Sequence, residues 1–300
     1  MNRDNLIGMK KIFGLCVLSF LIIGNCFAQR QVSAGKNLGN NKVGAFEHVE
    51  GAFIAVNGIN MYYEEYGEGP ALLMLHDNGG SVESFNSQIN YFSKKHRVIV
   101  ADGRGQGKTN NTADSLTYEL LLEDYNALLE KLEVDSAYVI GFDDGAIVGL
   151  MLAMHFPEKV KMLAIYGARL NAEPNTIVDA STDLEKVYKQ MYSDSVKAGK
   201  KEYKDDLQLT NLVLHHPEID ADLLINITAP VLVMGGDRDI IQLEHTVFLY
   251  KQLPHAQLSI FPGATHYFMS ETPMLFNNAV SKFFSKPFND VEVEDTIKFK

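Results

Sequence analysis

The sequence predicts an α/β protein with a mostly parallel, eight-stranded sheet, helices on both faces and a helical insertion that caps the sheet. Three observations support this prediction. Short apolar runs alternate along the chain with longer segments in which apolar residues recur at helical spacing. Runs such as 71–75 (ALLML) are apolar throughout, as is typical of parallel strands covered on both faces. The composition, 46% hydrophobic and 22% charged over 300 residues, is that of a globular protein.

The strands and helices can be placed in order from these patterns. We expect strands at 52–56, 60–66, 71–75, 96–101, 137–140, 160–166, 230–234 and 258–261. We expect helices at 82–94, 118–132, 243–253 and 274–284, and one directly after Gly145. Asn57-Gly58 is a strong hairpin-turn signal between the first two strands. Residues 262–266 are expected to form a loop after the last strand.

The alternation of strand and helix breaks between about 168 and 228. This stretch is polar and helix-rich, with no obvious buried strand, so we expect an insertion above the sheet. It interrupts a domain at 48–286. A polar lead-in at 29–47, rich in Gly and Asn, precedes this domain, and a charged tail at 287–300 follows it.

Residues 1–28 have the pattern of a signal peptide. Lys10-Lys11 precedes an apolar run, and the small residues Cys26 and Ala28 lie where a signal peptidase cuts. The run is shorter than the roughly 20 residues of a membrane span, so we expect no stable membrane anchor, with a retained anchor as the alternative. The chain is therefore expected to be exported, periplasmic or secreted, after cleavage near Ala28. Both cysteines lie in this segment, so the mature chain would have no disulfide and no cysteine nucleophile.

Charge and residue spacing limit the partners of this chain. The formal net charge of −11 argues against nucleic acid as a partner. His215-His216 with Glu218 and Asp220 does not match the spacing of a standard metal site. We expect no metal, no cofactor and a small-molecule substrate, and the oligomeric state stays open.

The segment 137–150 has the layout of a nucleophile elbow. An apolar strand meets Gly141-Phe142-Asp143-Asp144-Gly145 and continues into an apolar helix. In such an elbow a sharp strand-to-helix turn lifts the middle side chain above the sheet. The commonest residue at that position is Ser, whereas this chain has Asp143.

Further polar residues follow other predicted strands. They are His76-Asp77-Asn78-Gly79-Gly80, Asp102-Gly103-Arg104-Gly105-Gln106-Gly107, Gly236-Asp237-Arg238-Asp239 and Gly263-Ala264-Thr265-His266. Open α/β sheets form their ligand sites at the carboxyl ends of their parallel strands. With the elbow motif, these segments in this order resemble the α/β-hydrolase fold family over essentially the whole mature chain.

The resemblance implies a role for each matching residue. Asp143 takes the nucleophile position, Asp239 that of the acid and His266 that of the base. The oxyanion hole would be formed by the backbone N–H of Asp144 and by that of Asn78 or Asp77. The family usually has His-Gly where this chain has His76-Asp77, so we expect Asp77 to adopt the glycine conformation.

An aspartate at the elbow favours a particular chemistry. A carboxylate can attack an sp³ carbon that carries a leaving group and form an alkyl ester. Water activated by His266 would then hydrolyse that ester. The branches that this pattern resembles are epoxide hydrolases and dehalogenases. Dehalogenases hold the halide with Trp, which this chain lacks. Epoxide hydrolases protonate the epoxide oxygen with cap tyrosines, for which Tyr188 and Tyr192 are substrate-binding candidates.

Two other interpretations remain open. Apart from Asp143, the motifs are closest to those of serine esterases and lactonases of the same fold. The chain could therefore be a degenerate relative that binds a ligand without turnover. It could also be a weak carboxylic ester hydrolase, in which His266 activates water directly and Asp143 only orients that water.

Overall fold

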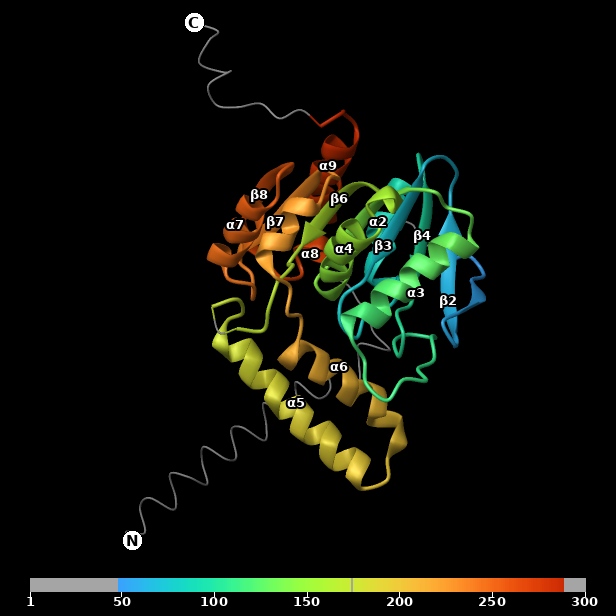
Figure 1. Ribbon diagram of the computed structural model, residues 1–300, viewed down its shortest axis with the longest axis vertical. Coiled ribbons are helices and arrows are strands. Elements are labelled where there is room, and N and C mark those ends of the chain that lie inside the picture. Colours follow the sequence, from blue (N-terminus) through green and yellow to red (C-terminus); the bar gives the residue numbers. More distant parts are fainter. Residues whose placement is uncertain (1–47, 174, 289–300) are drawn as a thin grey trace, which may run out of the picture. The chain divides into compact units, whose positions relative to one another are not determined.

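The computed structural model describes residues 48–173 and 175–288 (Figure 1). The predicted signal peptide, the lead-in and all but the first two residues of the predicted tail lie outside these ranges. All described residues belong to one structural unit, Phe46–Lys300.

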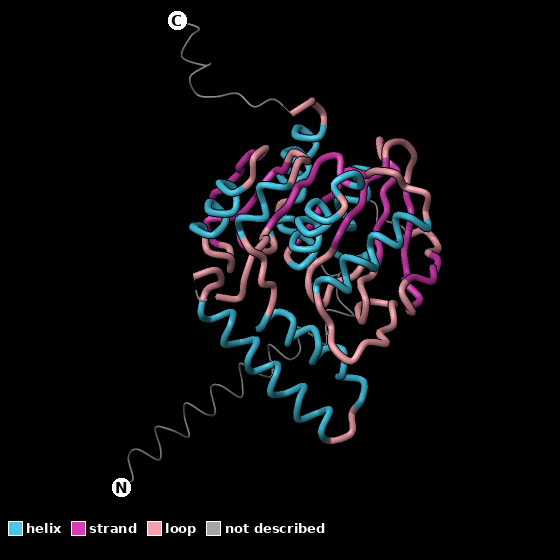
Figure 2. The backbone as a smooth tube through the Cα atoms, viewed as in Figure 1, coloured by secondary structure: helices cyan, strands magenta, loops and turns pink. Residues whose placement is uncertain are grey.

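An eight-stranded sheet forms the centre of this unit, and Figure 2 shows its strands in magenta between the helices. The strand order is β1-β2-β4-β3-β5-β6-β7-β8. The strands are β1 (Ala52–Val56), β2 (Ile59–Tyr66), β3 (Ala71–Leu75), β4 (Arg97–Ala101), β5 (Ala137–Phe142), β6 (Val160–Tyr166), β7 (Val231–Arg238) and β8 (Ala256–Thr265). β2 pairs antiparallel with β1 and β4, and every other neighbouring pair is parallel. The predicted fold class is confirmed. Positive φ angles at Asn57 (43°) and Gly58 (78°) also confirm the predicted hairpin turn.

Helices cover both faces of the sheet. They are η1 (Val82–Phe85), α2 (Asn86–Phe92), α3 (Tyr118–Lys131), α4 (Asp144–His155), η2 (Pro157–Lys159), α7 (Leu243–Gln252), α8 (Phe268–Glu271) and α9 (Pro273–Phe284). Side chains alternate along each strand. Leu73 and Leu75 therefore share a buried cluster with α3, α4 and α7, whereas Leu72 and Met74 share one with α2, α8 and α9.

Two sequence predictions about element boundaries are wrong. The helix expected at 82–94 is divided, because Ser81 caps a first 3-10 turn and α2 begins only at Asn86. The loop expected at 262–266 is mostly strand, since β8 continues to Thr265, which pairs with Arg238 after a register shift. That pairing joins residues far apart in sequence, so a local apolar pattern does not reveal it.

Between β6 and β7 the chain forms α5 (Asp179–Lys197), η3 (Lys201–Tyr203), α6 (Lys204–His215) and η4 (Ala221–Asn226). We call α5, η3 and α6 the cap. Figure 1 shows α5 and α6 packed against each other beyond the carboxyl ends of the parallel strands. α5 has no fully buried residue, whereas α6 buries Leu209 and Leu212. The cap therefore rests on the core mainly through α6.

No helix within 48–173 or 175–288 combines the length and the apolarity that a membrane crossing requires.

Candidate active site

Asp143 occupies the turn between β5 and α4 in a strained conformation. Its φ is 53° and its ψ is −118°. The turn is tight, because a Cβ at Gly145 would collide with the backbone oxygen of Leu75. The backbone N–H of Asp143 donates to Tyr166 O at 3.0 Å, which ties the turn to the neighbouring strand. The structure therefore has the elbow geometry that the sequence predicted.

His266 and Asp239 lie beside this turn, on the segments that follow β8 and β7. His266 Nδ1 is 2.7 Å from Asp239 Oδ1, and His266 Nε2 is 3.6 Å from Asp143 Oδ1. His266 is 5% exposed, so the imidazole is almost fully shielded from solvent. Gly167 makes room for it, since a Cβ there would lie 2.8 Å from His266 Cε1. The three residues proposed for the catalytic roles are thus brought together.

The charges of these three groups stabilise one another. Burial lowers the pKa of His266, but its contacts with Asp143 and Asp239 and their negative charges outweigh this and raise the pKa to about 10. Burial raises the pKa of Asp143, but the contact with His266, with further help from Arg169 and Asn78, holds that pKa below its usual value. These contacts therefore favour the protonated form of His266 in the resting site.

Of the two oxyanion-hole alternatives, the structure brings Asn78 to the nucleophile. Its backbone N–H donates to Asp143 Oδ2 at 3.2 Å. The N–H of Asp144 is the first of α4 and has no partner within that helix. Among the described residues, no hydrogen bond joins the backbone N–H of Asp77 to Asp143, and the Asp77 carboxylate accepts the Ser84 hydroxyl at 2.7 Å.

The expectation that Asp77 takes a glycine conformation is wrong. Asp77 is not among the described residues with positive φ, whereas Gly79, two positions later, has φ 67°. The tight turn of this loop has its glycine after Asn78 instead of before it. An aspartate at position 77 therefore needs no left-handed backbone.

Asp144 brings a second carboxyl group beside Asp143. Its Oδ1 accepts the Tyr118 hydroxyl at 2.5 Å, and its Oδ2 accepts Asn78 Nδ2 at 2.7 Å. Burial and the charge of Asp143 raise the pKa of Asp144 to about 6, although Arg169, Tyr118 and Asn78 oppose this shift. The Asp144 side chain thereby fixes Asn78, whose backbone N–H contacts Asp143.

Arg169 is a buried cation that the sequence analysis missed. It follows β6, is 1% exposed, and donates to Val213 O of α6 at 2.9 Å and to the Tyr118 hydroxyl at 3.5 Å. Its position after a parallel strand was an available signal, because ligand sites lie at that edge. Tyr118 gave no such signal, since it occupies an ordinary helical position.

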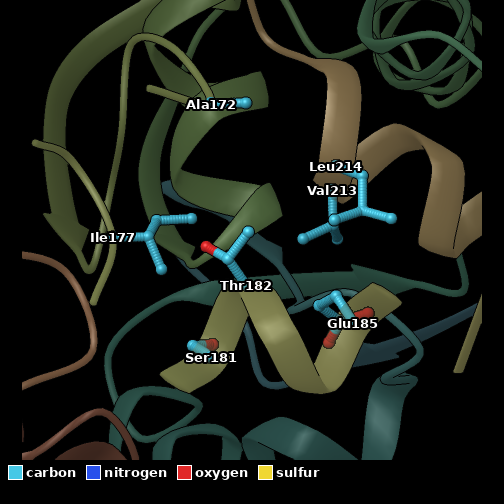
Figure 3. Close-up of a pocket in the computed structure, with 7 residues that line it drawn as sticks. All are labelled: Ala172, Ile177, Ser181, Thr182, Glu185, Val213 and Leu214. Atoms are coloured by element: carbon cyan, nitrogen blue, oxygen red, sulfur yellow. The ribbon is translucent and has the colours of Figure 1, made fainter. Parts of the chain in front are cut away.

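The two cap tyrosines lie on one face of α5, as the sequence predicted. The rings of Tyr188 and Tyr192 stack at 6.2 Å, and Tyr192 stacks on Tyr203 at 5.9 Å. Burial, followed by the charge of Asp206, raises the pKa of Tyr192 to about 12. Neither Tyr188 nor Tyr192 lines the pocket shown in Figure 3. Their role in substrate binding remains a prediction.

A pocket lies between the cap and the segment that follows β6 (Figure 3). It holds about 250 Å³ of space, part of it open to solvent. Its walls are Ala172, Ile177, Ser181, Thr182, Glu185, Val213 and Leu214. Aliphatic side chains predominate, and Glu185 is the one ionisable residue among them. The pocket is small and mainly apolar.

Comparison with known proteins agrees with this architecture. The family model described as "alpha/beta hydrolase fold" matches residues 70–191. This chain has the α/β-hydrolase fold. A solved α/β hydrolase from a Medee basin deep-sea metagenome, MGS-M2, superposes with a TM-score of 0.69 at 21% identity, covering 81% of this chain and 100% of that one. At that identity the likeness concerns the fold alone.

Curated relatives of this chain fall into more than one class. The uncharacterized hydrolase YraK of Bacillus subtilis is 32% identical over 112 residues, which is 37% of this chain and 41% of YraK. Epoxide hydrolase 1 of Siraitia grosvenorii is 36% identical over 120 residues, 39% of this chain and 38% of that enzyme. 3-Oxoadipate enol-lactonase 2 of Acinetobacter baylyi is 24% identical over 256 residues, 76% of this chain and 94% of that enzyme.

Proposed function

We propose that this chain is a hydrolase that uses Asp143 as a nucleophile toward an sp³ carbon and hydrolyses a small apolar electrophile, an epoxide or a related alkyl compound, through an alkyl-enzyme ester. Asp239 orients His266, and His266 activates the water that hydrolyses the ester. The backbone N–H groups of Asn78 and Asp144 hold the oxyanion that forms during hydrolysis.

One observation carries this proposal: the two carboxylate oxygens of Asp143 have different surroundings. Oδ2 accepts the N–H of Asn78, and Oδ1 is 3.6 Å from His266 Nε2. If Oδ1 attacks the substrate carbon, Oδ2 becomes the ester carbonyl oxygen and already has a hydrogen-bond donor. A water near His266 can then attack Cγ of Asp143. The Cγ–Oδ1 bond breaks, and Oδ1 leaves in the product alcohol.

Formation of the ester also prepares His266 to act as a base. In the resting site His266 is protonated, because the negative charges of Asp143 and Asp239 raise its pKa to about 10. Alkylation neutralises Asp143 and removes one of those charges. The pKa of His266 then falls and its proton passes to solvent, so the neutral imidazole can accept a proton from water. It returns that proton to the departing alkoxide. His266 takes a proton up again from solvent when hydrolysis restores the Asp143 carboxylate.

The relatives support a hydrolase of this kind without deciding its substrate. The Siraitia grosvenorii relative named epoxide hydrolase 1 is 36% identical over 120 residues. The enol-lactonase aligns over 94% of its own length, and this favours a second candidate, a serine-hydrolase scaffold that lost its nucleophile. The two candidates differ in whether Asp143 becomes alkylated.

A single-turnover experiment in heavy-oxygen water tests the proposal, with styrene oxide as the probe. We expect ¹⁸O in Asp143 and ordinary oxygen in the first diol formed, because Oδ1 leaves with the product. His266→Gln should accumulate the ester, because its hydrolysis should be slowed about 10²-fold or more. The ester is detected as a mass increase of the intact protein. Asp143→Asn is the matched control that forms no ester.

Two outcomes would contradict aspartate chemistry. The first is ¹⁸O that passes directly into the diol while Asp143 stays unlabelled. The second is a wild-type protein that forms no adduct, together with an Asp143→Ser variant that gains hydrolysis of p-nitrophenyl acetate. That pair of results would support the second candidate, in which the protein is a serine-hydrolase relative that has lost its nucleophile.

A further inference from the structure

We propose that Glu185 of the cap helix α5 is a further catalytic residue, the acid that protonates the oxygen released when Asp143 attacks. This role rests on the proposed function of Asp143. It assigns to a glutamate the step for which the sequence had suggested the cap tyrosines. Four features of the structure support it: the place of Glu185 in the pocket, the anchoring of its helix, its lack of a partner and its electrostatic surroundings.

Glu185 lies on the wall of the pocket shown in Figure 3. Thr182 comes from the same helix, one turn earlier, and Val213 and Leu214 of α6 form another wall. The aliphatic walls suit the apolar part of a substrate. The carboxyl group of Glu185 supplies an ionisable group beside it.

The start of α5 is attached to the loop that carries the proposed catalytic acid. Val178 N donates to Ile240 O at 2.9 Å, and Gln242 N donates to Thr176 O at 2.9 Å. Asp239 directly precedes Ile240 in that loop, and its Oδ1 is hydrogen-bonded to His266 Nδ1. These backbone hydrogen bonds fix the first turns of α5, and Glu185 with them, relative to the catalytic loops.

Among the described residues, the Glu185 carboxylate has no hydrogen-bond or ion-pair partner, as is also true of Glu202 and Asp206 in the cap, whereas other cap carboxylates do have partners. Asp183 pairs with Lys186 at 3.0 Å, and Asp205 accepts Asn111 at 2.9 Å. A half-buried carboxyl group without a partner is free to bind and protonate a substrate oxygen.

The charged groups that act on Glu185 belong to the catalytic centre. Burial raises its pKa first, the charges of Asp143 and Asp144 raise it further, Arg169 opposes them, and the result is about 7. A general acid works best with a pKa near the operating pH. Tyr192, with a pKa raised to about 12, would be a much weaker acid.

The proton balance closes over one turnover of an epoxide. Asp143 Oδ1 forms a bond to the epoxide carbon, the carbon–oxygen bond breaks, and the released oxygen takes the proton of Glu185. The ester carries no charge, so the repulsion that kept Glu185 protonated is relieved as the proton leaves. Hydrolysis consumes one water: one of its protons reaches the product through His266, and the other restores the acid form of Glu185.

The test measures ester formation against pH in the His266→Gln background, where the adduct accumulates. With Glu185 intact and 1,2-epoxyhexane as the probe, we expect the rate to fall above pH 7 as the acid loses its proton. With Glu185→Gln the rate at pH 6 should be about 10²-fold lower and independent of pH near 7. Glu202→Gln, an exposed cap glutamate in η3, is the matched control and should behave as the parent.

The outcomes separate this role from the role of Asp143. An unchanged rate and pH profile in Glu185→Gln would overturn the role of Glu185, as would loss of the profile in Tyr192→Phe alone. No adduct even with Glu185 intact would overturn the proposed function, and the acid role with it. Thermal unfolding of each variant shows whether a lost rate reflects a lost fold.

Discussion

Asp143 must satisfy two requirements at one position, a backbone with positive φ and a reactive side chain. Its φ of 53° with ψ −118° lies outside the left-handed helical region in which Asp is most often tolerated. The surrounding strand and helix therefore hold the elbow in a strained conformation. The chemistry of the site then depends on which groups surround the carboxylate, chiefly His266 and Asn78.

The pKa of His266 predicts how stability depends on pH. An imidazole has a pKa near 6.5 when unfolded, and His266 has one of about 10 in the folded protein. The folded state therefore holds the proton more tightly. This stabilisation is complete below about pH 6.5 and is lost as the pH rises through about 10. Relative to His266→Gln, the wild-type protein should lose roughly a few kcal/mol over that range.

Urea unfolding of both proteins at a series of pH values measures this difference. Titration of tyrosines and lysines affects both proteins alike and cancels in the comparison. Parallel stability curves for the two proteins between pH 6.5 and 10 would show that His266 is neutral in the resting site.

How far single residues could be predicted depends on where their partners lie in the sequence. Asp143, Asp239 and His266 each lie in a short motif after a predicted strand, so they could be named together. Glu185 could not be named, because its proposed role arises from the way the cap folds over the elbow, which no local pattern encodes. Arg169 follows a strand, so its position gave a signal, but that signal alone does not reveal its charge interaction with the two aspartates of the elbow.

At the scale of elements, the elbow is a junction of three segments: β3, β5 and α4. The start of α4 lies against the end of β3, which leaves no room for a side chain at Gly145. Strand interiors and the hairpin could be predicted, since apolar runs and Asn57-Gly58 are local signals. The far ends of β7 and β8 could not, because the pairing of Arg238 with Thr265 is not local.

Replacement of Gly145 should therefore damage the elbow strongly. Gly145→Ala places a Cβ against backbone atoms of Leu75 and His76 that cannot move aside, and we expect a loss of about 3 kcal/mol. Gly149→Ala, on the next turn of α4, is the control: its Cβ would lie 2.9 Å from Leu163 Cδ1, the end of a side chain. Because Ala favours a helix by about 1 kcal/mol over Gly, that variant should stay within about 1 kcal/mol of wild type. Chemical denaturation measures the free energy of unfolding of both variants. Equal losses of stability would show that Gly145 is no more tightly packed than Gly149.

At the scale of the whole described unit, the sheet with its helices and the cap differ in how they are held. β5 and α4 lie within the large buried cluster, whereas α5 has no fully buried residue. The sequence indicated this division, because the stretch from about 168 to 228 lacks a buried strand. It could not indicate how the cap attaches, since the hydrogen bond from Val178 to Ile240 joins two loops far apart in sequence.

This division predicts that the cap opens without unfolding the sheet. Amide hydrogen exchange should be at least about 30-fold faster in α5 than in α4, a difference of about 2 kcal/mol in opening free energy.

The attachment of α5 to the loop after β7 can be tested by substitution at Val178. Val178→Pro should make exchange in α5 about fivefold faster than in the wild-type protein, because it removes the hydrogen bond to Ile240, worth about 1 kcal/mol. The φ of Val178, −66°, already suits proline, so little strain is added. Val178→Ala keeps the N–H and is the control. If α5 exchanged as slowly as β5, or if Val178→Pro accelerated both equally, the cap and the sheet would be one cooperative unit.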